Sequence, residues 1–362
     1  MSAISRQAKG LVVVTGANGF IAGHVILSLL SSGYAVRGTV RSLERCQHLQ
    51  SVESPLHPYL LQGFFSLTEV TDLTDLTSPT EVAAAFADAT AVAHLAQPVS
   101  FNTDAEYVVG TAVRGTQTAL EAAAQIKSVK SFVLMSSISA VRMLVSNPAP
   151  PGHVITADEW DDADLKVKAL QAEGKPLPGP LVYAASKAAG ERALWEFVKL
   201  NKPGFATTAI NPVFVAGPSA VPPRTATDIS GTTKFIFDLL AGKDLPPPER
   251  LVGYGAYVDV RDVARLVSFA IGHSEVADGH RFLAVSSWVH PQGVVDVLRK
   301  AYPDRHHIIQ EGTPGEGYIN GFGFPHSAPK FDTATAVKAS GEGWIPFEDT
   351  ILAAAQAYKG LL

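Results

Sequence analysis

The sequence predicts an α/β protein: a Rossmann-type, doubly wound parallel sheet with a smaller, discontinuous C-terminal substrate lobe. Three observations lead to this fold class. Short apolar, β-like runs alternate with helical segments over the first 140 residues. These runs are continuously apolar, as in strands that are buried on both faces of a parallel sheet. Beyond residue 212 proline and glycine become frequent and the alternation turns irregular, which indicates a second lobe assembled from several segments.

The elements of the first part can be placed in chain order. Residues 11–15 form the first apolar run, residues 21–31 are apolar at helical spacing, and Gly33 ends that helix. Further strands are expected at 34–40, 67–74, 91–95, 132–136 and 205–210. Further helices are expected at 111–126, 163–172 and 184–200.

Composition excludes several classes of protein. The chain has 362 residues and a net charge of −5, with 46% hydrophobic and 17% charged residues, which suits a globular core rather than a disordered chain. No long basic run is present, so nucleic acid is not an expected partner. No apolar stretch reaches the ~18 residues of a membrane span, and no convincing signal peptide is found, so we expect a cytoplasmic protein.

The residues that bind metals or form disulfides are sparse. Cys46 is the single cysteine, which rules out an internal disulfide framework and a multi-cysteine metal site. The eleven histidines are scattered, and only His306 and His307 are adjacent. We therefore expect no metal site.

A glycine-rich turn joins the first strand to the first helix. Gly16 permits a tight turn, Gly19 lets the backbone approach a pyrophosphate, and the small Ala22 lets the helix pack closely on the strand. The helix N-terminus would then offer unpaired N–H groups to the phosphates. Because the turn follows an apolar strand and opens a helix, we expect a dinucleotide site that includes Asn18 and Phe20–Ile21.

The end of the second strand indicates which nicotinamide cofactor is bound. An NAD site usually carries a carboxylate about 20 residues after the glycines, to bond the ribose 2′-hydroxyl. Here Arg41 ends the strand, Arg45 follows one turn later, and no carboxylate stands at the decisive position. Guanidinium groups suit a 2′-phosphate, so NADPH/NADP+ is the expected cofactor. A solvated surface arginine is the alternative reading, most of all for Arg45.

A serine pair and a Tyr-x-x-x-Lys pair supply candidate chemistry. Ser136 and Ser137 follow the fifth strand, and Tyr183 and Lys187 lie one turn apart on the helix after the proline-rich connection. An ammonium group beside the phenol, with the charge of an oxidised nicotinamide, would lower a tyrosine pKa that is normally about 10. A serine at a strand end could polarise a substrate carbonyl.

These motifs together resemble the extended short-chain dehydrogenase/reductase superfamily. Within it, the chain is most similar to the fungal NADPH-dependent carbonyl and aldehyde reductase group, which includes methylglyoxal reductase and is related to dihydroflavonol and cinnamoyl-CoA reductases. The resembling segments are 15–22, 40–42, 92–96, 115–116, 132–137, 183–187, 210–218, 258–264 and 331–333. Two departures are Ala22 in place of the third glycine and an enlarged connection between Ser137 and Tyr183.

The resemblance implies roles for particular residues. Ser137 would hold the carbonyl oxygen, Tyr183 would give the proton, and Lys187 would support the tyrosine and the cofactor ribose. The further cofactor contacts that it implies are Ser136 beside the nicotinamide, Asp75 and Leu76 at the adenine, with Asp72–Leu73 as an alternative, Ala96 in the groove, and Pro212 and Val213 at the carboxamide. By position, four apolar residues are candidates for the substrate pocket or, equally, for the core: Val99, Phe101, Ile138 and Phe214.

The sequence thus predicts reduction of aldehydes and ketones to alcohols with NADPH, on hydrophobic or aromatic small-molecule carbonyl substrates. The alternatives are a nucleotide-sugar epimerase or dehydratase of the same superfamily and a non-catalytic NADP-sensing regulator. A monomer and a homodimer are both compatible with the sequence. The expected NADP-binding domain is 1–211 with part of 255–290; the substrate lobe is 212–254 and 291–362, and 145–180 forms an enlarged loop near the active site.

Overall fold

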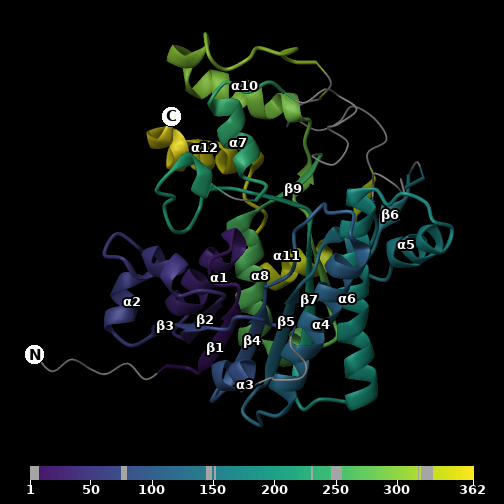
Figure 1. The fold of residues 1–362 in the computed structure, drawn as a ribbon. Helices are drawn as coiled ribbons and strands as arrows, with labels where there is room; N and C mark the ends of the chain where they lie inside the picture. Colours follow the sequence, from purple (N-terminus) through teal and green to yellow (C-terminus); the bar gives the residue numbers. More distant parts are fainter. Residues whose placement is uncertain are drawn as a thin grey trace, which may run out of the picture.

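The structure, a computed structural model, describes residues 8–74, 80–143, 149–150, 152–229, 231–245, 255–316, 318 and 329–362 (Figure 1). Its centre is a seven-stranded parallel sheet of strand order β10-β7-β5-β4-β1-β2-β3. The strands are β1 (Leu11–Thr15), β2 (Ala35–Val40), β3 (Phe65–Glu69), β4 (Ala91–His94), β5 (Ser131–Met135), β7 (Ala206–Pro212) and β10 (Arg281–Ala284). The predicted Rossmann-type, doubly wound sheet is confirmed.

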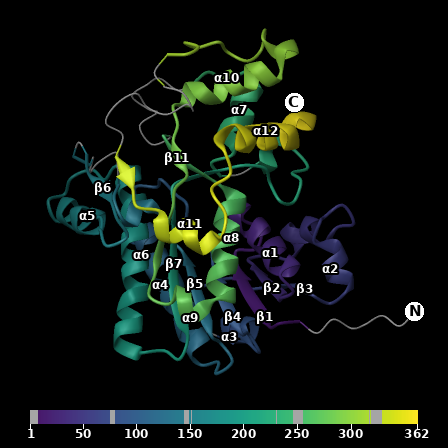
Figure 2. The ribbon, with the colours of Figure 1, turned by 180° about the vertical axis from the view of Figure 1, so that it is seen from behind.

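Helices cover both faces of this sheet, because successive strand residues point in opposite directions. Val12 and Val14 pack into one core cluster, and Val13 packs into another. One face carries α1 (Phe20–Ser31) and α8 (Val260–Gly272), which lie side by side (Figure 2). The other face carries α3 (Thr80–Phe86), α4 (Ala105–Ala124) and α6 (Gly179–Asn201).

A smaller lobe stands at one end of the sheet (Figure 1). Its three-stranded sheet consists of β8 (Phe214–Ala216), β9 (Ala256–Asp259) and β11 (Ser287–Trp288). Its helices are α7 (Lys234–Leu240), α10 (Pro291–Ala301) and α12 (Phe347–Tyr358), which share one apolar core. The remaining elements are α2 (His57–Leu61), α9 (Ser274–Ala277), α11 (Ala334–Ser340), and the 3-10 turns η1 (Glu44–Gln50), η2 (Ile138–Ala140), η3 (Ala226–Asp228), η5 (Pro303–Arg305) and η6 (Lys359–Leu361).

Two described segments of the enlarged connection pack against other parts of the protein. Its helix α5 (Ala163–Ala172) has the predicted bounds and packs on α6. Its strand β6 (Val154–Ile155) pairs with β12 (Lys330–Phe331) near the end of the chain. Residues far apart in sequence are therefore joined beside α6.

Several predicted elements differ in their bounds, such as the helix predicted at 184–200, which is α6 over Gly179–Asn201, and hydrogen bonds explain the difference at two others. The predicted strand 67–74 is β3 over Phe65–Glu69, because the following residues turn: the Asp72 carboxylate accepts hydrogen bonds from both the amide and the hydroxyl of Thr74. The predicted helix 111–126 begins earlier, since the Asp104 side chain caps α4 by accepting the Tyr107 amide.

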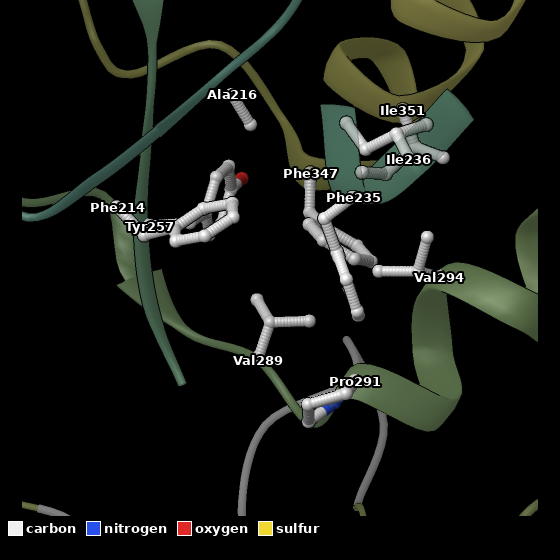
Figure 3. A pocket seen from close by; sticks show the side chains of 10 residues that line it. All are labelled: Phe214, Ala216, Phe235, Ile236, Tyr257, Val289, Pro291, Val294, Phe347 and Ile351. Atoms are coloured by element: carbon white, nitrogen blue, oxygen red, sulfur yellow. The ribbon is translucent and has the colours of Figure 1, made fainter. Parts of the chain in front are cut away.

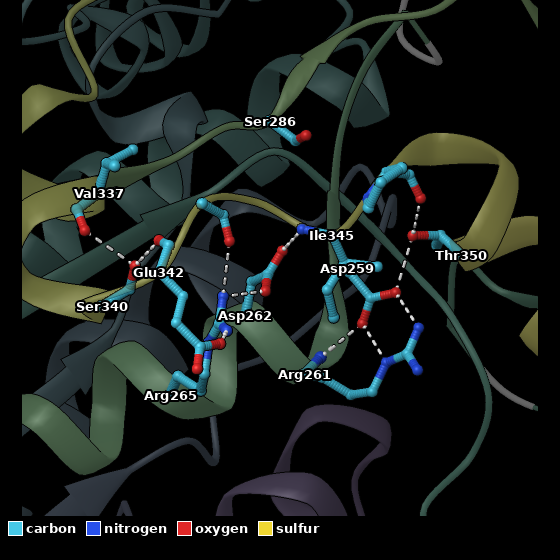
Figure 4. A network of polar contacts seen from close by, with 12 residues as sticks. Asp259, Arg261, Asp262, Arg265, Ser286, Val337, Ser340, Glu342, Ile345 and Thr350 are labelled. Atoms are coloured by element: carbon cyan, nitrogen blue, oxygen red, sulfur yellow. Dashed lines mark hydrogen bonds and ion pairs between the residues drawn. The ribbon is translucent and has the colours of Figure 1, made fainter.

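Two buried carboxylates, Asp259 at the end of β9 and Asp262 in the first turn of α8, bind the C-terminal segment (Figure 4). Asp259 caps α8, pairs with Arg261 at 2.7 Å and accepts the Thr350 hydroxyl of α12. Asp262 pairs with Arg265 and accepts the backbone amide of residue 345 at 2.9 Å. Burial raises the pKa of Asp262 to about 6.

Candidate functional site

The glycine turn forms an open cradle at the start of α1. Gly16 has a φ of +69°, and a Cβ there would lie 3.1 Å from the Ala96 Cα. The Gly19 amide bonds the Gly16 carbonyl at 2.9 Å, and both Asn18 and Gly19 are exposed. Phe20 and Ile21 then begin the helix, which has no side-chain cap, so the backbone amides of its first turn are available where a phosphate would bind.

Thr15 and His94 hold the two strands that flank this cradle. The Thr15 hydroxyl lies 3.0 Å from His94 Nδ1 and accepts the amides of Leu95 and Ala96, each at 3.0 Å. This arrangement places Ala96 beside Gly16. His94 is fully buried, and burial together with the Lys187 charge lowers its pKa to about 4, so it is a neutral, packed residue.

Gly38 is a part of the cradle that sequence reasoning missed. A Cβ at this position in β2 would come within 2.5 Å of the Ala17 Cβ, and the Ala17 amide bonds the Thr39 carbonyl at 2.9 Å. The sequence did contain an indication of this role, because a glycine inside a strand often marks a place where another backbone segment approaches closely.

Both candidate arginines for a 2′-phosphate are exposed at the end of β2. Arg41 follows the last residue of the strand, and Arg45 lies in the first turn of η1. Within the described residues neither guanidinium forms an ion pair or a hydrogen bond through its side chain. Two solvent-facing cations beside the cradle fit an anionic ligand group.

The structure brings the three candidate catalytic side chains together. Ser137 follows β5, its hydroxyl accepts the Ser139 amide at 3.2 Å, and it is hydrogen-bonded to the Tyr183 hydroxyl. Lys187 lies one helical turn after Tyr183 on α6, with its Nζ 5.7 Å from the centre of the tyrosine ring. Tyr183 keeps part of its surface open, whereas Lys187 is only 4% exposed.

Burial sets the protonation of this cluster. It raises the pKa of Tyr183 above its usual value of 10, although the bond from Ser137 opposes the rise. It lowers the pKa of Lys187 from 10.5 to about 8. At neutral pH the tyrosine therefore keeps its proton and the lysine its charge, so the cluster can donate a proton beside a cation.

The lysine makes stability depend on pH in a definite direction. Its folded pKa lies below its unfolded one, so between pH 8 and 9.5 the unfolded chain binds more protons and the free energy of unfolding rises with pH. We expect wild type to gain about 1.4 kcal/mol per pH unit in this range relative to Lys187→Met. Urea unfolding of both proteins from pH 7 to 9.5 measures this difference, and parallel curves would contradict it.

Two of the predicted pocket residues, Val99 and Phe101, are exposed apolar side chains on the loop after β4. Val99 is 75% and Phe101 63% exposed, and the Phe101 ring centre lies 5.4 Å from that of Tyr183. The loop comes this close because α6 begins with Gly179, where a Cβ would lie 2.1 Å from the Phe101 carbonyl oxygen. The Tyr183 ring therefore lies next to the exposed apolar ring of Phe101.

The other two predicted pocket residues lie in different apolar groups. Ile138 is buried beside Val141 and Leu283. Phe214, one residue beyond Val213, borders a small apolar gap in the core of the smaller lobe (Figure 3). The gap is lined by Phe214, Ala216, Phe235, Ile236, Tyr257, Val289, Pro291, Val294, Phe347 and Ile351.

The remaining predicted contacts have mixed outcomes. Asp75 and Leu76 lie outside the described residues, and the alternative Asp72 is exposed in its turn. Pro212 is buried at the end of β7, and the Val213 amide bonds the Ala284 carbonyl at 3.3 Å. The Ser136 hydroxyl donates to a carboxylate of α6, Glu191, at 2.5 Å, so its predicted place beside the nicotinamide stays a prediction.

The described part of the chain holds neither a metal-binding cluster nor a membrane-spanning helix. Among these residues no group of three or more His, Cys, Asp or Glu side chains is arranged to hold a metal ion. None of the helices there is long and apolar enough to cross a membrane.

The comparisons with known proteins agree with this geometry. Residues 12–284 match the NAD dependent epimerase/dehydratase family. The chain is 32% identical over 345 residues to aldehyde reductase 2 of Sporidiobolus salmonicolor, covering 94% of each chain. It is also 32% identical over 311 residues to a Candida albicans protein named as an NADPH-dependent methylglyoxal reductase, covering 84% of this chain and 86% of the other.

A solved structure supports the same assignment. The yeast methylglyoxal/isovaleraldehyde reductase complexed with NADPH superposes with a TM-score of 0.79 at 27% identity, over 97% of this chain and all of the other. The fold and the site thus define a nicotinamide-dependent protein of the extended short-chain dehydrogenase/reductase class. The chain belongs to the NAD dependent epimerase/dehydratase family, and its relatives include fungal reductases of aldehydes.

Proposed function

We propose that this protein is an NADPH-dependent reductase that converts aldehydes and ketones to alcohols. The observation that carries the proposal is geometric: Tyr183 lies beside Ser137 and one helical turn from the buried Lys187, whose Nζ is 5.7 Å from the centre of the tyrosine ring. Such a tyrosine can donate a proton to a carbonyl oxygen at neutral pH. The aldehyde and methylglyoxal reductases among the relatives support this reading.

The residues of the cradle fit the nicotinamide cofactor. A tight turn at Gly16 and Gly19 that has no room for side chains, the N-terminus of α1 and two exposed arginines suit a pyrophosphate and a 2′-phosphate. When bound, NADPH supplies the hydride that reaches the carbonyl carbon. The proposed cofactor residues are Gly16, Asn18, Gly19, Phe20, Ile21, Arg41, Arg45, Asp75, Leu76, Ala96, Ser136, Tyr183, Lys187, Pro212 and Val213.

Ser137, Tyr183 and Lys187 then have separate roles at the carbonyl oxygen of the substrate. The Ser137 hydroxyl accepts the Ser139 amide through its oxygen, so its own proton remains to be donated to the substrate oxygen. Tyr183 transfers its phenolic proton to the same oxygen, which completes the alcohol. The Lys187 ammonium stabilises the phenolate that is left.

The substrate class follows from the surface in front of Tyr183. Phe101 presents an apolar ring beside the phenol, the exposed Val99 lies two residues before it in the chain, and Phe214 follows Val213 with further apolar side chains around it. A hydrophobic or aromatic carbonyl compound suits this lining better than a sugar nucleotide, whose hydroxyls and phosphates need polar partners. We assign cofactor binding to 1–211 with part of 255–290, and substrate binding to 212–254 and 291–362.

Phe101→Ala tests this surface. We expect the KM for an aryl ketone to rise about 10-fold, since the loss of an aromatic contact costs roughly 1.5 kcal/mol, with kcat nearly unchanged. The KM for the small substrate methylglyoxal should change little. Steady-state kinetics with both substrates check this, with Tyr107→Phe as a control that keeps an exposed aromatic ring on α4. An equal loss with both substrates would contradict a role in recognition.

The test of the proposed function is the loss of NADPH absorbance with a panel of carbonyls. The panel holds methylglyoxal, an aryl ketone and an aliphatic β-keto ester, with NADH run alongside. Turnover with NADPH is the expected result. Binding of NADPH without oxidation across the panel, together with turnover of a sugar nucleotide, would instead favour the epimerase activity after which the family is named.

A further inference from the structure

A buried carboxylate lies directly behind the proposed catalytic residues. Glu191 follows Lys187 by one turn on α6, so Tyr183, Lys187 and Glu191 share one face of the helix. The Glu191 side chain has no exposed surface. A buried carboxylate is costly unless each of its oxygens is bonded to donors, which makes its partners informative.

Four donors surround this carboxylate. Its Oε2 accepts the Ser136 hydroxyl at 2.5 Å and the Asn211 side-chain amide at 2.7 Å. Its Oε1 accepts Arg281 Nε at 2.5 Å and the Trp195 indole N–H at 3.2 Å. Each oxygen of the carboxylate therefore accepts two hydrogen bonds, one from each of two donors.

One of these bonds leads to the catalytic serine. The Asn211 side-chain nitrogen also donates to the Ser137 carbonyl at 3.1 Å. Ser136 and Ser137 are consecutive, so Glu191 holds the first directly and the second through Asn211, which is itself fully buried. The Ser137 backbone in turn sets where its hydroxyl meets Tyr183.

The second carboxylate oxygen of Glu191, Oε1, is linked through Arg281 to the enlarged connection. Arg281, whose side chain is only 8% exposed, donates to the carbonyls of Ala157 and Glu159 at 2.6 Å each. Its guanidinium also lies 3.9 Å from the ring centre of Trp160. One buried ion pair thus connects the 157–160 segment to Glu191 of α6 and, through it, to the Ser136–Ser137 segment after β5.

We propose that Glu191 is a positioning residue that sets the Ser137 hydroxyl through Ser136 and Asn211, with Arg281 anchoring the 157–160 segment to it. The inference rests on the proposed function, because it assumes that Ser137 holds the substrate oxygen. Glu191 touches neither substrate nor cofactor here; it acts through the serine. The sequence indicated no role for the long connection, and this contact supplies one.

Glu191→Gln is the direct test. Glutamine keeps the shape but turns an N–H₂ group towards surrounding donors, so the serine segment must shift. We expect kcat to fall about 10- to 100-fold, since displacements of about 1 Å are enough for such losses, while the Kd for NADPH from fluorescence quenching stays within about twofold. Trp195→Phe is the matched control: it removes one bond to Oε1, leaves the serine branch intact, and should keep kcat.

A double-mutant cycle separates positioning from general damage. In a Ser137→Ala background the hydroxyl is gone, so Glu191→Gln should lower kcat no further. An equal fold loss in both backgrounds, or an unchanged kcat in the single variant, would overturn the inference while the proposed function stands. Full activity of Ser137→Ala alone would instead overturn the assumed role of the serine.

A second variant covers the case in which Glu191→Gln does not fold. Asn211→Ala leaves the Glu191–Arg281 pair in place and removes only the link to Ser137. We expect it to lower kcat by a similar factor, again with no further loss in the Ser137→Ala background. An unchanged kcat for a folded Asn211→Ala protein would contradict the proposed path.

Discussion

Tyr183→Phe should abolish most carbonyl reduction. The substitution removes one oxygen, the proposed proton donor, and leaves the ring that packs beside Phe101. General acid catalysis contributes about 10²- to 10⁴-fold, so kcat should fall by roughly 10³-fold. Because the phenol is bonded to Ser137 and not needed for the phosphate cradle, NADPH affinity should stay within a few-fold. Stopped-flow measurement of NADPH oxidation, with fluorescence for binding, gives both quantities.

The control for this variant is Tyr107→Phe, which removes a phenol from an exposed position on α4. Its kcat should match wild type. If Tyr183→Phe retained more than about a tenth of wild-type kcat, another group would have to supply the proton. His94 could not easily do so, because it is fully buried and its pKa of about 4 leaves it neutral.

Arg41→Ala should weaken NADPH selectively. A hydrogen bond to a charged group is worth about 1.5–3 kcal/mol, so the KM for NADPH should rise about 10- to 100-fold. NADH lacks the 2′-phosphate, so its KM should stay nearly constant. Steady-state kinetics with both cofactors measure the ratio. Arg45→Ala serves as a graded comparison, with a smaller effect expected from a position one turn further on.

The two cofactors make this prediction specific. A general loosening of the second strand would weaken NADPH and NADH by the same factor, and that result would contradict the role of Arg41. Arg37→Ala is a suitable control for such loosening, because Arg37 in β2 donates to the carbonyls of Ala85 and Ala87 and faces no proposed ligand group.

Sequence patterns within a few residues predicted the elements whose structure depends mainly on neighbouring residues. The first strand, turn and helix follow from an apolar run, a glycine with positive φ and helical spacing, and the structure has them where predicted. Tyr183 and Lys187 lie one turn apart because a helix brings residues four apart onto one face. The family resemblance, which the comparisons confirm, supplied the pairing with Ser137.

Contacts between distant segments could not be predicted in this way. Glu191 and Arg281 are 90 residues apart, and nothing in either local pattern links them. The need for a glycine at position 38 comes only from the Ala17 side chain opposite it, which leaves no room for a Cβ. The early end of β3 depends on hydrogen bonds within the turn that follows. Such features need the assembled sheet, since a strand's neighbours are set by topology rather than by sequence distance.

The proposed reaction transfers a hydride from NADPH to the carbonyl carbon of the substrate. The product is an alcohol, which is released. The most direct measurement uses NADPH deuterated at the nicotinamide C4, on each face in turn, with an aldehyde or ketone that turns over in the panel, and mass spectrometry of the product. We predict an alcohol that carries one deuterium on its former carbonyl carbon, from one face only, with one NADP+ formed per alcohol. Product without deuterium from either face, or conversion without net NADPH consumption, would contradict the account.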